Sequence, residues 1–198
     1  MAVRGANSKL RPQNSKLSAP RYNRRMARFH FRCIECGETY REDPTLMVCP
    51  ICSSQQEPGG ATRGVLEVAL KSLPTTWPHF RASDPEFLSA FLPIGDVASI
   101  PAIPVGDTPL LEAPRLRNAL GLPHLFLKDD TLNPSGSTKD RASLLVVTKA
   151  IEYGLDTVAT ASTGNAATAL AAVAAAAGLR AIVSESVRTR PPRRTSHC

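Results

Sequence analysis

Residues 157–183, "TVATASTGNAATALAAVAAAAGLRAIV", decide the fold class, because they contain a strand, a helix and a second strand in that order. The run at 157–162 is typical of a strand, and the alanine-rich run from 164 predicts a buried helix that ends at Gly178. A further strand is expected over 179–183. A strand, a helix and a strand of this size form a parallel pair with a crossover helix. The segment therefore predicts an α/β fold, a parallel sheet with flanking helices.

The residues before this unit show the same alternation of strands and helices. A strand over 108–114 is expected to lead into a helix over 114–121. A second strand over 124–130 is expected to lead into a helix over 137–154. We expect all the strands to share one parallel sheet. In such sheets ligands bind at the carboxyl ends of the strands, in the loops that begin the helices. The two loops in that position are the candidate site.

The first loop, "DDTLNPSGSTKDRA" at 129–142, brings Lys139 to the first turn of its helix. A helix N-terminus carries partial positive charge and favours acids, so we expect it to lower the pKa of a lysine there. A lysine with a lowered pKa can act as a nucleophile or form a Schiff base. The alternative is that Lys139 points to solvent and Asp140 caps the helix dipole.

The second loop, "TASTGNAAT" at 160–168, offers the groups that bind an anion. Ser162 and Thr163 have hydroxyls, Gly164 allows close backbone approach, and the amide of Asn165 both donates and accepts. Together with the amides at the helix start, they predict a site for a carboxylate or phosphate. The alternative is ordinary capping of the helix by Ser162 or Thr163.

Four of the five cysteines form two C-x2-C pairs separated by twelve residues: Cys33 and Cys36, then Cys49 and Cys52. Two such turns on facing hairpins aim four thiolates at one point, and four sulfur ligands leave no open position. The pattern therefore predicts a structural zinc site, a small zinc ribbon. Two disulfides or four unrelated thiols are the alternatives, and without a secretory signal disulfides are disfavoured. We assign no role to Cys198.

The net charge of +7 is confined to the two ends, because residues 33–183 contain eleven basic and sixteen acidic residues, a net of −5. This argues against a nucleic-acid groove in the folded part. No apolar run is long enough to span a membrane. The first segment could be a transit peptide. We favour instead a disordered segment or a misplaced start, with translation beginning at Met26. We expect a disordered basic N-terminus at 1–29, a zinc ribbon at 30–70 and a wrapping linker at 71–107. A partial enzyme domain at 108–183 and a non-native-looking basic tail at 184–198 follow.

Two runs together carry a family resemblance: "KDDTLNPSGSTKDRAS" at 128–143 and "ASTGNAATALAAVAAAAGL" at 161–179. They resemble the pyridoxal-phosphate (PLP) enzymes of the tryptophan-synthase-β type, fold type II, and look most like threonine synthases. The opening "GDTPLLEAPRL" at 106–116 and the cysteine ribbon are similar to the N-terminal part of many threonine synthases. The resemblance covers residues 30–183.

The resemblance implies a role for each residue of the two loops. Lys139 would hold pyridoxal 5'-phosphate as a Schiff base and then move protons, and Asn165 would hydrogen-bond the ring oxygen of the cofactor. Ser162, Thr163 and Gly164 would bind the carboxylate of a small amino-acid substrate. The implied reaction is that of a lyase, which converts O-phospho-L-homoserine and water to L-threonine and phosphate. A cytoplasmic location and, for the full-length family, a homodimer are also implied.

The sequence departs from the family pattern after Val183, where it becomes "SESVRTRPPRRTSHC". The glycine-rich loop for the cofactor phosphate and the residue expected beside the pyridine nitrogen are absent. We therefore expect a frameshifted or truncated product, inactive and prone to aggregate because strand edges and apolar helix faces are uncovered. Purified protein with PLP should show no stable Schiff-base absorbance and no phosphate release.

Two other functional classes stay open at this point. One is a related fold type II PLP enzyme, a threonine dehydratase or a cysteine-synthase-like sulfhydrylase, against which the ribbon counts modestly. The other is a non-catalytic zinc-ribbon module whose basic tails touch nucleic acid or another protein; few aromatic residues and an acidic core disfavour it.

Overall fold

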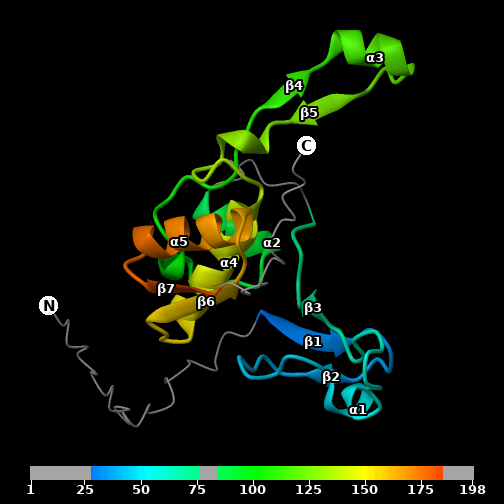
Figure 1. Cartoon of the computed structure of the whole chain (residues 1–198), viewed down its shortest axis with the longest axis vertical. Coiled ribbons are helices and arrows are strands. Elements are labelled where there is room, and N and C mark those ends of the chain that lie inside the picture. The colour runs from blue at the N-terminus through cyan, green and yellow to red at the C-terminus, as the bar shows by residue number, and fades with distance from the viewer. Residues whose placement is uncertain (1–27, 76–83, 185–198) are drawn as a thin grey trace, which may run out of the picture.

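The computed structural model describes residues 28–75 and 84–184. Figure 1 shows three parts: a ribbon of the strands β1 to β3, an α/β body around the helices α4 and α5, and an arm that extends away from the body. Of the two predicted basic ends, residues 1–27 and 185–198 lie outside the described residues, whereas Phe29 and Ser184 lie in strands.

The ribbon is a three-stranded antiparallel sheet in the order β2-β1-β3, formed by Phe29–Cys33, Thr39–Tyr40 and Leu66–Leu70. The first cysteine pair lies at the end of β1 and in the turn to β2, as a hairpin requires. The second pair was predicted to lie on a facing hairpin, and this prediction is wrong. It lies at the start of and within the short helix α1, Pro50–Ser53. Pro50 is the reason, since proline fits the first helical position and has no N–H to lose there.

The segment between ribbon and body contains the helix α2, Pro85–Phe91. A 3-10 turn, η2, follows at Val97–Ser99. Ile94 and Val105 of this segment are buried, and Val105 belongs to the core of the body. That the segment is a wrapping linker over 71–107 stays a prediction.

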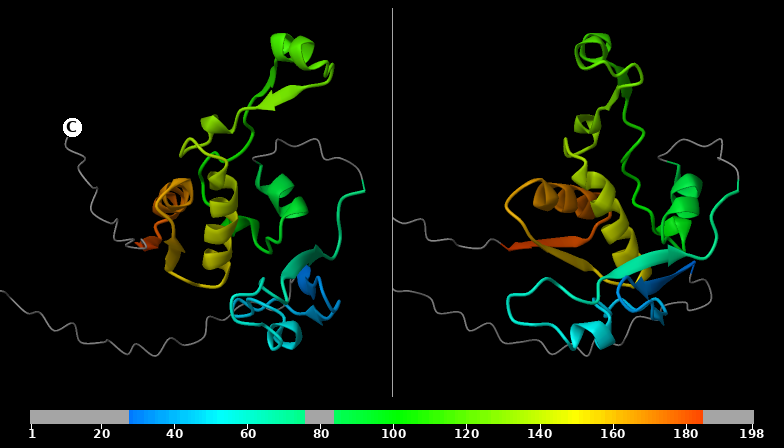
Figure 2. Two further views of the ribbon diagram at one scale, coloured as in Figure 1. Left: turned by 45° about the vertical axis from the view of Figure 1, so that its right-hand side comes forward. Right: turned by 90° about the vertical axis from the view of Figure 1, so that its right-hand side faces the viewer.

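The body is built from α4 (Lys139–Glu152), β6 (Thr157–Ala161), α5 (Asn165–Ala176) and β7 (Arg180–Ser184). β6 and β7 pair in parallel, and α4 and α5 pack side by side against them (Figure 2). The core contains side chains from both helices and from β6, among them Leu144, Val147, Val158, Leu170 and Val173. The predicted strand, crossover helix and strand are therefore confirmed. No helix in the described part of the chain is long and apolar enough to cross a membrane.

The arm consists of β4, α3 and β5, which span Leu110–Glu112, Pro114–Leu120 and Phe126–Lys128. β4 and β5 pair antiparallel, so the prediction that these strands join one parallel sheet is wrong. The seven-residue α3 lies at the far end of the arm in Figure 1 and does not carry the chain back to the start of β4. A parallel pair needs such a return crossover. Gly121, with φ 65°, ends α3 in the left-handed conformation and directs the chain into β5.

Candidate functional site

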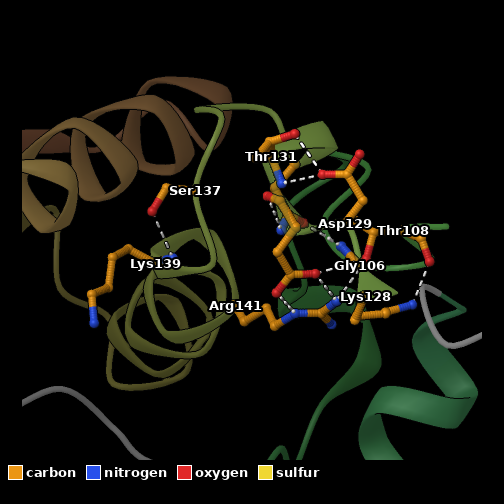
Figure 3. Close-up of polar contacts among 10 residues, drawn as sticks. Gly106, Thr108, Lys128, Asp129, Thr131, Ser137, Lys139 and Arg141 are labelled. Atoms are coloured by element: carbon orange, nitrogen blue, oxygen red, sulfur yellow. Dashed lines mark hydrogen bonds and ion pairs between the residues drawn. The ribbon is translucent and has the colours of Figure 1, made fainter. Parts of the chain in front are cut away.

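Lys139 is the first residue of α4, and its side chain is exposed. In Figure 3 it points away from Arg141, which forms an ion pair with Asp130. Its main-chain N–H donates to Ser137 Oγ at 3.1 Å. No hydrogen bond or ion pair of its ammonium group is found within the described residues. The side chain is therefore accessible to a ligand while the backbone below it is held.

An ionic cluster fixes the start of the lysine loop to α4. Arg141 donates to both carboxylate oxygens of Asp130, at 2.9 and 2.7 Å, and Thr108 Oγ1 donates to the same carboxylate at 2.7 Å (Figure 3). The Arg141 guanidinium, followed by the Thr108 hydroxyl, holds the pKa of Asp130 well below its ordinary value. The carboxylate is thus charged at neutral pH and ties the root of the arm to the first turn of α4.

The second loop lies between β6 and α5. Ser162 is half-buried, whereas Thr163, Gly164 and Asn165 are exposed. Ser162 Oγ accepts from the N–H of Gly164 at 3.2 Å, and the helix begins after Gly164 without a side-chain cap. Capping by Ser162 or Thr163, the alternative raised from the sequence, is therefore not what the structure shows.

Gly164 has no structural need to be a glycine. Its φ of −130° and ψ of −151° are extended values that any residue adopts, and a Cβ there would meet no atom within 4 Å. The space beside it is open at the N-terminus of a twelve-residue helix, where backbone amides favour an anion. The fold thus leaves room at Gly164 for a ligand to approach the backbone closely.

The two loops precede neighbouring helices, α4 and α5, that pack against each other (Figure 2). Pyridoxal phosphate fits the donor set that they present. It requires an accessible amine for covalent attachment, which Lys139 supplies, and polar groups for oxygen atoms, which Ser162, Thr163 and Asn165 supply. Which atoms contact the cofactor remains a prediction.

The four cysteines of the ribbon form a second candidate site. Their sulfur atoms all lie within 4.8 Å of one another, and none of the four is in a disulfide. Cys33 and Cys52 are 3.8 Å apart between Sγ atoms, and Cys36 and Cys49 are 3.7 Å apart. A tetrahedron with Zn–S bonds of about 2.3 Å has edges of about 3.8 Å. The cluster therefore has the dimensions of a four-sulfur metal site, as the spacing predicts.

One thiol of this cluster is prepared for ionisation. Tyr40 Oη lies 3.1 Å from Cys49 Sγ, and this hydrogen bond lowers the pKa of Cys49 to about 6. Burial raises the pKa of Cys52 to about 12. A metal bound here would take all four sulfurs as thiolates, so its binding would release the protons that the free thiols hold.

The comparisons with known proteins agree with this geometry. The family model described as pyridoxal-phosphate dependent enzyme matches residues 102–196, a range that contains both loops. Residues 102–196, just under half of the chain, are therefore similar to that family. The resemblance to PLP-dependent enzymes predicted from the two motifs is thereby confirmed. The match continues into the segment predicted as a non-native tail, whose boundaries stay a prediction.

Among the curated relatives of this PLP-dependent segment, several are threonine synthases. The enzyme of Methanosarcina acetivorans is 34% identical over 158 residues, which are 78% of this chain and 36% of that protein. The enzyme of Methanocaldococcus jannaschii is also 34% identical, over 77% of this chain and 36% of its own length. That of Synechocystis is 44% identical over 47% of this chain and 25% of its own length. The chain thus spans about a third of the length of the first two relatives.

The structure also shows a buried cluster that the sequence did not predict. Glu42, which follows β2 in the ribbon, accepts from Lys149 Nζ and, at 2.7 Å, from Tyr153 Oη at the end of α4. Lys149 also pairs with Glu152, and the exposed fractions of Glu42, Lys149 and Glu152 are 2%, 13% and 5%. We call these four residues the Glu42 cluster. It joins the ribbon to the helix that begins with Lys139.

Proposed function

We propose that the protein is a threonine-synthase-type lyase that converts O-phospho-L-homoserine and water to L-threonine and phosphate. The observation that supports this most is the pair of loops, one with an exposed lysine and one with an open glycine, at the starts of two packed helices. Identities of 34–44% to threonine synthases favour this reaction over others of the family.

Each residue of the two loops has a proposed task. Lys139 attaches the cofactor covalently and afterwards transfers protons at the substrate carbons. Asn165 donates to the cofactor ring oxygen, while Ser162, Thr163 and Gly164 hold the substrate carboxylate against the start of α5. Pyridoxal phosphate, when bound, supplies the electron sink for the carbanions of the reaction.

The four cysteines are proposed to hold a structural zinc ion. The sulfur–sulfur distances of 3.7 and 3.8 Å support zinc, and four protein ligands leave no position for a reacting water. Free thiols at a metal site fit a reducing compartment, so we place the protein in the cytoplasm. We also propose a homodimer, supported by the exposed leucines of the arm, among them Leu110, Leu116 and Leu120.

The reaction is tested by phosphate release from O-phospho-L-homoserine, with the protein isolated from its natural source and its Lys139→Ala variant as control. Release of phosphate together with L-threonine, lost in the variant, would support the proposed reaction and contradict the inactivity expected of the 198-residue chain. Formation of 2-oxobutyrate from L-threonine, or of cysteine from O-acetylserine and sulfide, without threonine synthesis would favour a dehydratase or a sulfhydrylase instead. The expected inactivity of the 198-residue chain stays a prediction that the same assay tests.

A further inference from the structure

The loop before Lys139 turns its polar side chains inward. Asn133, Ser137 and Asp140 are 4%, 7% and 0% exposed, although Lys139 itself is exposed. Asn133 Oδ1 accepts from the N–H of Gly106 at 2.9 Å, which fixes one end of the loop. These buried polar groups flank the lysine on both sides, so the loop is held from within.

Asp140 contacts Ser135, a residue further back along this loop. Its Oδ2 accepts from the N–H of Ser135 at 2.9 Å and from the Ser135 hydroxyl at 2.8 Å. Its Oδ1 is buried and has no hydrogen-bond partner among the described residues. A buried carboxylate with one unpartnered oxygen is costly. The sequence suggested that Asp140 caps the helix dipole. An exposed acid would do this equally well, so capping does not explain why Asp140 is buried.

We propose that Asp140 is a positioning residue for Lys139. By holding both polar groups of Ser135, its carboxylate closes the turn 135–139 and fixes the direction in which the Lys139 backbone presents the amine. The inference rests on the proposed attachment of the cofactor to Lys139. It requires the hydrogen bonds of Asp140 and not its negative charge.

Three variants separate these roles. Asp140→Ala removes both hydrogen bonds, Ser135→Ala removes only the one from the hydroxyl, and Asp140→Asn keeps an acceptor of the same shape without the charge. Asp129→Ala is the matched control, since Asp129 Oδ1 likewise accepts from the N–H and the hydroxyl of one residue, Thr131, at 3.1 and 2.6 Å. Asp129 is the first residue of the lysine loop and lies apart from Lys139 in Figure 3.

The readout is the distribution of pyridoxal phosphate over the lysines of the full chain after borohydride reduction and peptide mass mapping. Reduction captures an imine even when it is short-lived, and a purely stabilising residue does not alter the distribution well below the melting temperature. Circular dichroism verifies that each variant is folded. We expect the Asp140→Ala variant to lose about tenfold in the preference for Lys139 over Lys149, because orientation governs the reaction of a bound group. The Ser135→Ala variant should be intermediate, and the Asp140→Asn and Asp129→Ala variants close to wild type.

Two different failures can be told apart. A wild-type chain without preference for Lys139 would overturn the proposed function and the inference together. A wild-type chain that labels Lys139 while the folded Asp140→Ala variant labels it equally would overturn the inference alone. An Asp140→Asn variant with wild-type folding and no preference would also overturn it, because charge would then matter. If Asp140→Ala does not fold, the Ser135→Ala and Asp140→Asn variants decide.

Discussion

Removal of the Glu42 side chain tests whether the ribbon and α4 are held together by the Glu42 cluster. The Glu42→Ala change removes two hydrogen bonds to a charged acceptor, each worth about 1.5–3 kcal/mol. It also leaves Lys149 nearly buried, with Glu152 as its remaining carboxylate partner. Breaking a buried ion pair costs about 3–5 kcal/mol, and because one partner remains we expect the lower value, about 3 kcal/mol. For a chain of this size that lowers the melting temperature by about 6–12 °C.

Thermal unfolding followed by circular dichroism measures this effect. Tyr153→Phe, which removes the hydroxyl that donates to Glu42 and keeps the ring, should lower the free energy of unfolding by about 1.5 kcal/mol. The control is Asp156→Ala, because the Asp156–Arg180 pair is 81% and 75% exposed and exposed ion pairs contribute little to stability. If Glu42→Ala unfolds at the same temperature as this control, the Glu42 cluster does not join the two parts.

Three further predictions concern the ribbon and the ionic cluster at α4. Gly64→Ala should weaken zinc binding about tenfold in a competition titration, since Gly64 has φ +74° and a Cβ would lie 2.9 Å from a backbone oxygen of the second cysteine turn. Gly37→Ala, with φ +76° but open space, is its control, and equal affinities of the two variants would contradict the steric argument. Cys36→Ser should reduce the bound zinc, measured by mass spectrometry, from one per chain to well below one; an unchanged content would exclude the four-cysteine site. Because Arg141 lowers the pKa of folded Asp130 below the unfolded value of about 3.9, its contribution to stability is present above that pH and is lost as the pH falls through the folded pKa. Melting temperatures between pH 7 and pH 3 should therefore fall more steeply for wild type than for Asp130→Asn, and parallel curves would argue against this linkage.

Local sequence pattern predicted the elements whose features lie within a few residues. Gly178 and Gly121 end their helices as expected, with φ of 72° and 65°. The two cysteine pairs come together as their spacing requires. The direction of β5 relative to β4 was not predictable in the same way, because strands of three residues are too short to show the alternation typical of antiparallel strands. The length of α3 was the available signal, because seven residues are short for a crossover.

Contacts between distant residues escaped the sequence entirely. Glu42 meets Lys149 across 107 positions and Tyr153 across 111, and no local pattern marks such a meeting. Asp140 was recognised as a helix-start acid but not as a fully buried one. Its burial depends on how the loop folds back at Ser135, which is a property of the packed structure.

The central claim is that Lys139 is the residue to which pyridoxal phosphate becomes attached. The most direct measurement is reduction of the full chain with borohydride in the presence of the cofactor, followed by mass mapping of all six lysines. The predicted result is a label concentrated on Lys139 and lost from that position, without transfer to Lys128 or Lys149, in the Lys139→Arg variant. Labels spread over the lysines according to their exposure alone would contradict the claim.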